Sequence, residues 1–147
     1  ARDPKCLLCP LTGECQGLKN GDPARLPVKA PKKAKPVRQG NAYWIEREGA
    51  VWLVRREGKG MLGGMRSLPD DGWSARGDGD AKVPLKGEWN AAGLVRHTFT
   101  HFSLELSVQR YAGSATRTGD GEWWPLDRLD EAGLPTLFAK AARLALA

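Results

Sequence analysis

Residues 102–109 read FSLELSVQ, an alternation of apolar and polar side chains without a break. Side chains point to opposite faces of a β-strand in turn, so this pattern predicts a strand with one face in a hydrophobic core and the other in water. The chain has 147 residues, of which 41% are hydrophobic, and is long enough to build one such core. We therefore expect a single domain with an appended arm.

Two more strands and a loop are predicted upstream. Residues 43–47 and 51–55 are short runs of aromatic and β-branched residues separated by 48–50, which indicates a hairpin. Residues 58–65, GKGMLGGM, form a glycine-rich loop. The order GxxxxGK[ST] is missing, so this loop favours a tight turn with close backbone packing over a phosphate cradle.

The C-terminal quarter changes to helical spacing. Residues 123–125 close the β region, and 127–132 predict a short helical turn that stops at Gly133. The last helix is expected to start near Pro135 or Thr136. Its apolar positions fall on one face, with Lys140 and Arg143 on the other: Leu137, Phe138, Ala141, Leu144 and Ala145. Strands and helices together predict an α+β fold.

Basic charge is concentrated ahead of the domain. Six cations and no acid lie between Asp22 and Glu46, so the charge of this segment equals the net charge of the whole chain, +6. Four prolines in the same stretch indicate an extended, semi-rigid backbone. An extended basic arm suits a phosphate backbone, and a merely solvated linker is the alternative. No apolar run approaches the 18 to 20 residues that are needed to span a bilayer.

All three cysteines lie near the start, at Cys6, Cys9 and Cys15. Such crowding of thiols favours metal ligands over three unrelated thiols, and the odd count argues against disulfides. A tetrahedral thiolate site or an iron–sulfur cubane needs four ligands, so either the fourth ligand lies outside the chain or a different group completes the shell. A zinc knuckle is the intermediate alternative.

The spacing C-x2-C-x5-C within DPKCLLCPLTGEC resembles the end of the iron–sulfur loop of adenine DNA glycosylases of the MutY type. That family carries C-x6-C-x2-C-x5-C around a [4Fe-4S] cluster. The resemblance implies that Cys6, Cys9 and Cys15 bind such a cluster, with the first cysteine of the pattern just before Ala1. The chain would then be the C-terminal part of a longer protein.

Two more motifs resemble the Nudix-like domain that ends the same family. Residues 61–65 and 68–69 are similar to its LLGG(L/M)WEFP loop, although 66–68 depart from Trp-Glu-Phe. Residues 97–102, HTFTHF, are similar to HTFSHF, whose Phe-Ser-His turn enters DNA and senses 8-oxoguanine. The resemblance implies recognition by Phe99, Thr100 and His101, with Thr100 in place of the serine.

These three residues also suit DNA by their chemistry. Phe99 is a flat apolar wedge, while the Thr100 hydroxyl and the His101 imidazole can hydrogen-bond a base edge. The alternative from spacing alone is that Phe99 and Phe102 belong to the core and His101 is a surface residue. His97 is interpreted as a partly buried polar residue that enters the strand.

The resemblance covers nearly the whole chain and divides it into three parts. Residues 1–16 would be the remnant of the cluster loop, 17–41 an extended basic linker, and 42–147 a Nudix-like domain with a mixed, mostly antiparallel sheet and flanking helices. Beside such a domain, the cations of the arm are expected to contact the DNA backbone: Lys29, Lys32, Lys33, Lys35 and Arg38.

The implied function is base-excision repair. The parent would remove adenine opposite 8-oxoguanine or guanine in double-stranded DNA, with its catalytic residues in a helical domain before Ala1, and the fragment itself would be inactive. We expect a monomer in the bacterial cytoplasm, associated with the nucleoid and with no membrane partner. The alternatives are a Nudix hydrolase of nucleoside diphosphates, which needs a metal-binding helix that acids 70–88 are too scattered to form, and a stand-alone nucleic-acid-binding module with a zinc knuckle.

Overall fold

The fold comes from a computed structural model that describes residues 3–31, 33–115 and 119–147. The chain divides into two compact units, Ala1–Ala34 and Lys35–Ala147. Across the described segments, every helix falls short of the length and apolarity that a membrane crossing requires.

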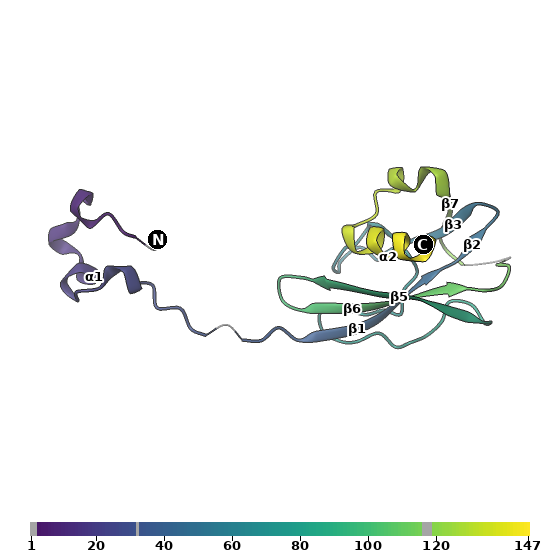
Figure 1. Ribbon diagram of the computed structural model, residues 1–147, viewed down its shortest axis with the longest axis horizontal. Helices are drawn as coiled ribbons and strands as arrows, with labels where there is room; N and C mark the ends of the chain where they lie inside the picture. Colours follow the sequence, from purple (N-terminus) through teal and green to yellow (C-terminus); the bar gives the residue numbers. More distant parts are fainter. Residues whose placement is uncertain (1–2, 32, 116–118) are drawn as a thin grey trace. The chain divides into compact units, whose positions relative to one another are not determined.

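The N-terminal unit is built from short helical turns (Figure 1). These are η1 (Cys6–Leu8), η2 (Thr12–Glu14), α1 (Gln16–Lys19) and η3 (Pro23–Arg25). None of them contains a buried residue. Local backbone hydrogen bonds, such as those from Cys9 N to Cys6 O and from Lys19 N to Cys15 O, hold the turns instead of a hydrophobic core.

The first sheet of the C-terminal unit has the order β1-β6-β5. Its strands are β1 (Val37–Trp44), β5 (Trp89–Thr98) and β6 (Ser103–Tyr111). β1 runs parallel to β6, and β5 runs antiparallel to it. β6 contains the alternating stretch: Leu104, Leu106 and Val108 are buried and the residues between them are half-buried. The two-faced strand is confirmed.

The second sheet is centred on β3 (Ala50–Arg55), which pairs antiparallel with three short strands. These are β2 (Glu46–Arg47), β4 (Arg66–Ser67) and β7 (Glu122–Pro125). Glu48 and Gly49 connect β2 to β3 with φ of 49° and 75°, the left-handed conformation of a tight hairpin. The predicted hairpin therefore exists, but Tyr43 and Trp44 belong to β1 and not to it.

Helical segments close the chain as predicted. The 3-10 helix η4 (Leu126–Ala132) stops at Gly133, whose φ is 67°, and α2 (Thr136–Leu146) follows. Five residues form the buried face of α2: Leu137, Phe138, Ala141, Ala142 and Ala145. This face matches the expected spacing, except that Ala142 is also buried and Leu144 is only partly buried. The α+β prediction and the mixed, mostly antiparallel pairing are confirmed.

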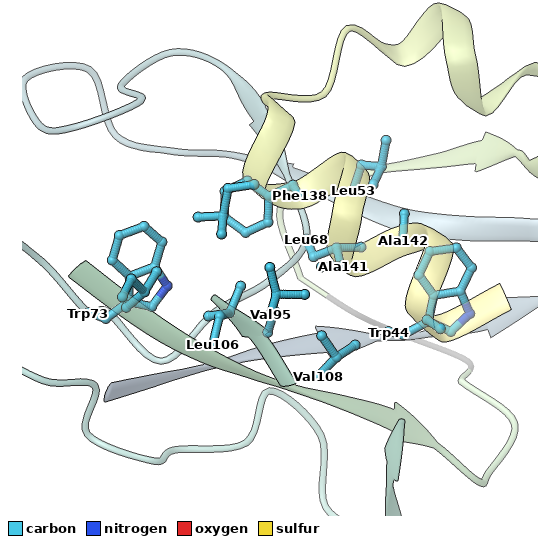
Figure 2. Close-up of a cluster of buried hydrophobic side chains, with 14 of the residues drawn as sticks. Trp44, Leu53, Leu68, Trp73, Val95, Leu106, Val108, Phe138, Ala141 and Ala142 are labelled. Atoms are coloured by element: carbon cyan, nitrogen blue, oxygen red, sulfur yellow. The ribbon is translucent and has the colours of Figure 1, made fainter. Parts of the chain in front are cut away.

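One hydrophobic cluster joins both sheets to α2 (Figure 2). Val95, Leu106 and Val108 come from the first sheet, Leu53 from the second, and Phe138, Ala141 and Ala142 from α2. The core therefore lies between the helix and the sheets, and it fixes the end of each strand in space.

Trp73 enters this core from residues 68–88, a segment without helix that joins β4 to β5. Gly40 of β1 lies against the indole, because a Cβ on Gly40 would come within 2.6 Å of a ring atom. Asp71 is also buried and accepts hydrogen bonds from Asn41 N at 3.0 Å and Asn41 Nδ2 at 2.7 Å. These contacts bind the irregular segment to β1.

Two strands of the first sheet, β1 and β5, differ from the expectation. The second unit starts at Lys35 and β1 occupies residues 37–41 of the predicted linker, while α1 and η3 lie in the rest of it. In the first half of β1 the buried residue is Gly40, so no apolar alternation marks this part of the strand. β5 was not expected as a strand, because a register shift between Ala91 and Gly93 and its exposed residues break the period of two.

The contact between Gly40 and Trp73 generates a stability test. Gly40→Ala places a methyl group against the indole and should lower the free energy of unfolding by about 1–3 kcal/mol, measured by urea denaturation. Gly58→Ala is the matched control, because a Cβ there meets nothing within 4 Å. It should change stability by less than about 0.5 kcal/mol. Equal effects of the two substitutions would contradict the packing argument.

Candidate functional site

The turn between β5 and β6 lies beside the start of β1 at one end of the first sheet (Figure 1). Phe99 N donates to Phe102 O at 2.8 Å and closes the turn, which leaves Thr100 and His101 exposed at its tip. Lys35 Nζ donates to Phe99 O at 3.0 Å, and Ser103 N donates to Pro36 O at 2.9 Å. The arm and the turn, predicted separately, thus meet.

Phe99 is only partly free to act as a wedge. Its ring stacks on the buried Phe102 with centroids 4.7 Å apart and an interplanar angle of 22°. Its centroid is also 4.6 Å from that of His97 and 6.1 Å from that of Trp73. The structure therefore places Phe99 at the margin of the core, and Thr100 and His101 are the side chains that the turn presents to solvent.

Two more cations border this end of the sheet. Arg38 Nε donates to Ala75 O at 3.3 Å, which brings the turn of residues 74–77 alongside β1. Arg76 is exposed on that turn. We call Lys35, Arg38 and Arg76 the basic rim. Among the described residues, none of these three cations forms an ion pair within 4.0 Å.

The predicted DNA-backbone residues that the structure describes are divided between the two units. Lys29 and Lys33 are exposed in the N-terminal unit, whereas Lys35 and Arg38 belong to the C-terminal unit. Lys32 lies outside the described residues. Arg76, which the sequence did not suggest, joins the rim because Gly79 N donates to Gln39 O and holds the segment against β1.

His97 occupies the predicted position, half-buried below the turn. Burial, with a smaller effect from the Lys140 cation, lowers the pKa of His97 from its ordinary value of 6.5. A neutral imidazole beside Phe99 adds packing surface without bringing a charge into the core.

The three cysteines lie in the N-terminal unit, where the Thr12 hydroxyl donates to the carbonyl oxygens of Cys6 and Cys9. Cys6 and Cys15 are half-buried and Cys9 is exposed. In the described part of the chain, no three His, Cys, Asp or Glu side chains come together as a metal-ligand group. The thiols as placed do not form a cluster site, so that prediction still depends on their spacing.

A concavity of about 870 Å³ opens between the glycine-rich loop and residues 69–76. At its wall, Arg56 Nη1 donates to Asp70 Oδ2 at 2.5 Å, and the guanidinium lies 4.5 Å from the centroid of the Trp73 ring. Burial raises the pKa of Asp70 despite the neighbouring guanidinium. The loop packs closely as predicted, because a Cβ on Gly63 would lie 3.0 Å from backbone atoms.

The acids of residues 68–88 take structural contacts. Asp71 binds Asn41, Asp78 Oδ1 accepts from Gln39 N at 3.0 Å, and Asp80 pairs with Lys82 at 2.9 Å. The segment is fully described and contains no helix, so these carboxylates do not line one helical face. This agrees with the expectation from their scattered spacing.

The fold consists of one mixed sheet, one antiparallel sheet and a terminal helix that packs on both. A family model for the NUDIX domain matches residues 41–144. The chain belongs to the NUDIX domain family. The match begins within β1 and ends within α2, so the NUDIX domain includes the turn at Thr100 and two strands of the first sheet in full.

Solved structures share the fold of this NUDIX domain. The C-terminal domain of mouse MUTYH, in a complex with human PCNA, aligns with a TM-score of 0.56 and 18% identity over 72% of this chain and 85% of that chain. MutT from Methanosarcina mazei Go1 aligns with a TM-score of 0.57 and 20% identity over 77% of this chain and 96% of that chain. A MutT NUDIX hydrolase from Burkholderia pseudomallei aligns with a TM-score of 0.52 and 19% identity over 76% of this chain and 97% of that chain.

The pKa of His97 yields a pH prediction. The unfolded chain takes up this proton at the ordinary value and the folded chain only below it, so stability should fall as pH drops through 6.5. NMR titration of the imidazole should give a midpoint below 6.5, and Lys140→Met should move it part of the way back. A midpoint at or above 6.5 would show that burial does not govern this group.

Proposed function

We propose that this chain is the DNA-reading part of an adenine DNA glycosylase of the MutY type, which recognises 8-oxoguanine paired with adenine. The observation that carries the proposal is the contact of the Thr100 turn with Lys35 of the basic rim at one end of the first sheet. Base readout and phosphate binding require such a pair of neighbouring features.

The turn supplies the groups for reading a base. Thr100 and His101 are exposed at the tip, and the strands below them are anchored in the core. A hydroxyl can accept a hydrogen bond from N7–H of 8-oxoguanine, whereas guanine offers only an acceptor at N7. Rigid support matters because a base contact discriminates only when its position is fixed.

Lys35 has a double role in this proposal. Its Nζ is 3.0 Å from Phe99 O, so the ammonium holds the turn while its exposed position leaves it open to a phosphate. Arg38 holds the turn of residues 74–77 in the same way through Ala75 O. Phosphates bound at the basic rim would therefore set the register of the Thr100 tip on the duplex.

The NUDIX fold also occurs in MutT hydrolases, so hydrolysis of nucleotides is the second candidate. That reaction is a metal-assisted attack on a pyrophosphate, and it needs carboxylates on one helix to hold Mg²⁺. Residues 68–88 form a loop whose acids bind Asn41, Gln39 and Lys82 instead. We therefore favour binding over hydrolysis. The C-terminal domain of mouse MUTYH shares the fold, as the MutT structures do, so the fold itself is compatible with both candidates.

The iron–sulfur cluster stays part of the proposal through the spacing of Cys6, Cys9 and Cys15. If a fourth thiolate from the parent completed the shell, the short 3-10 turns around Thr12 would have to bring the three thiols together. Iron with sulfide in the intact parent supports the glycosylase, and stoichiometric zinc without sulfide supports the zinc-knuckle alternative.

Thr100→Val tests lesion reading. The substitution keeps the shape of the side chain and removes the hydroxyl, so the preference of the chain for a duplex with 8-oxoguanine over one with guanine should fall by about 1–3 kcal/mol. Fluorescence anisotropy on the two duplexes measures it. An unchanged preference in a normally folded variant would remove Thr100 from the proposal.

Phe99→Ala separates stacking from packing in the same assay. Because Phe99 stacks on Phe102, its loss should lower stability as well as weaken binding to both duplexes by about 1–3 kcal/mol. Phe99→Leu restores apolar volume without an aromatic face and is the control for packing. Full affinity in Phe99→Leu would mean that Phe99 acts only as a core residue.

Arm cations should contribute affinity without sequence preference. Replacing Lys29 and Lys33 with Gln should weaken binding to all duplexes alike and reduce the salt slope by about 0.9 for each phosphate that the variant no longer neutralises. Lys19 and Lys86, also exposed, provide a control pair that removes the same charge elsewhere. If both pairs of substitutions change the slope equally, the arm is a solvated linker and the effect is one of net charge.

A further inference from the structure

β5 is an edge strand of the first sheet. β6 pairs with one side of it, and among the described residues no backbone hydrogen bond joins its other side to any element. Hydrogen-bonded and open positions alternate along an antiparallel pair. Phe99 N donates to Phe102 O, and Ser103 N donates to Pro36 O of the neighbouring chain segment and not to Thr98. Thr98 and Ser103 are therefore a pair without hydrogen bonds between them.

The alternation fixes which backbone groups of β5 face outward. Counting in twos from Thr98, the N–H and C=O of Leu94, Arg96 and Thr98 point away from β6. Upstream of these, the register shift between Ala91 and Gly93 interrupts the regular strand. The open edge is therefore the short regular segment 94–98, long enough to pair with one added strand.

A groove of about 430 Å³ runs beside this edge, between β5 and α2. Leu94 is 45% exposed in it, and Leu144 of α2 packs onto Gly93, where an added Cβ would be 2.8 Å from a Leu144 methyl carbon. The floor is thus apolar, and of the residues that the structure describes, no acidic one lines the groove.

Cations border the groove on its helical side. Lys140 and Arg143 lie one turn apart on α2 and are both exposed, and in the described segments neither forms an ion pair within 4.0 Å. Lys140 is near β5, since its charge contributes to the lowered pKa of His97. On the strand side, Arg96 is already paired with Glu105 at 2.9 Å.

We infer that the β5 edge binds an extended, acidic segment of a partner protein, which adds as a strand to the first sheet. Outward backbone groups of 94–98 would supply the main-chain hydrogen bonds. Apolar side chains of the segment would rest on Leu94, which lies on the sheet face away from α2, and the carboxylates that alternate with them would face α2 and meet Lys140 and Arg143. The inference is independent of lesion reading, because it uses no residue of the Thr100 turn.

Other occupants fit this surface less well. A second copy paired edge to edge would bring two sets of Lys140 and Arg143 together, and like charges in contact oppose assembly. A DNA backbone would match the cations, but it offers no strand to pair with the open amides and no apolar groups for Leu94.

The probe is a short acetylated and amidated peptide in which Val and Glu alternate, titrated into the 147-residue chain and followed by NMR. The amides of Leu94, Arg96 and Thr98 should gain protection from hydrogen exchange, while those of Val95 and His97, already bonded to β6, should not change. Protection spread over the surface without this alternation would overturn strand addition.

Charge reversal tests the choice of partner. Lys140→Glu with Arg143→Glu should weaken the Val–Glu peptide about tenfold, and it should improve binding of a matching Val–Lys peptide. Lys59→Glu with Lys86→Glu changes net charge equally outside the groove and should leave both affinities unchanged. Equal losses in the two double variants would show that only net charge matters, and would overturn the inference.

Two further measurements distinguish the other occupants. If the groove served DNA, the double variant at Lys140 and Arg143 would lose duplex affinity as strongly as peptide affinity. If it served a second copy, sedimentation would show a dimer of the unmodified chain that the Val–Glu peptide dissociates. Either result would overturn the acidic segment as occupant, whereas unchanged duplex binding and a monomer support it.

Discussion

The parallel pairing of β1 with β6 is the constraint on which both the core and the candidate site depend. It places Val37 beside Ser103 and carries the start of the domain to the base of the β5–β6 turn. Along the same strand, Gly40 lies under Trp73, while Ala42 and Trp44 enter the core on the same face of the sheet as the buried residues of β6. The strand that completes the sheet therefore also brings Lys35 to the turn that carries Thr100 and Arg38 to the turn of residues 74–77.

Local patterns predicted the elements that carry their own signal. Strict alternation identified β6, and apolar spacing with a glycine stop identified η4 and α2. The first half of β1 looks like linker because its residues after the exposed Val37 are polar or glycine, and its strand character comes from a partner that is 66 positions away. β5 has no clear signal of its own, because an edge strand with a register shift exposes residues of both faces.

The candidate site was predictable in part for the same reason. The HTFTHF stretch marked the turn, and its position at a strand end follows from the sequence. That Phe99 would stack on Phe102 and that Arg76 would reach the same end depend on how residues 68–88 lie against β1. Such a segment has no period, so nothing in the sequence reveals where its side chains go. Carboxylates would matter most to a hydrolase, but two of those in this segment, Asp71 and Asp78, hold β1 instead.

The distance along the chain between β1 and β6 has a consequence for biosynthesis. As the polypeptide leaves the ribosome, β1 emerges first and stays without its partner until Ser103 and the residues after it have been made. During that interval Ala42, Tyr43, Trp44 and Ile45, all buried in the finished protein, remain exposed to water. Domains with such non-local pairings fold slowly, and their unpaired apolar segments are the natural targets of chaperones. The nascent chain therefore exposes these apolar residues, and is prone to aggregate, until β6 has been made and the sheet below the Thr100 turn can form.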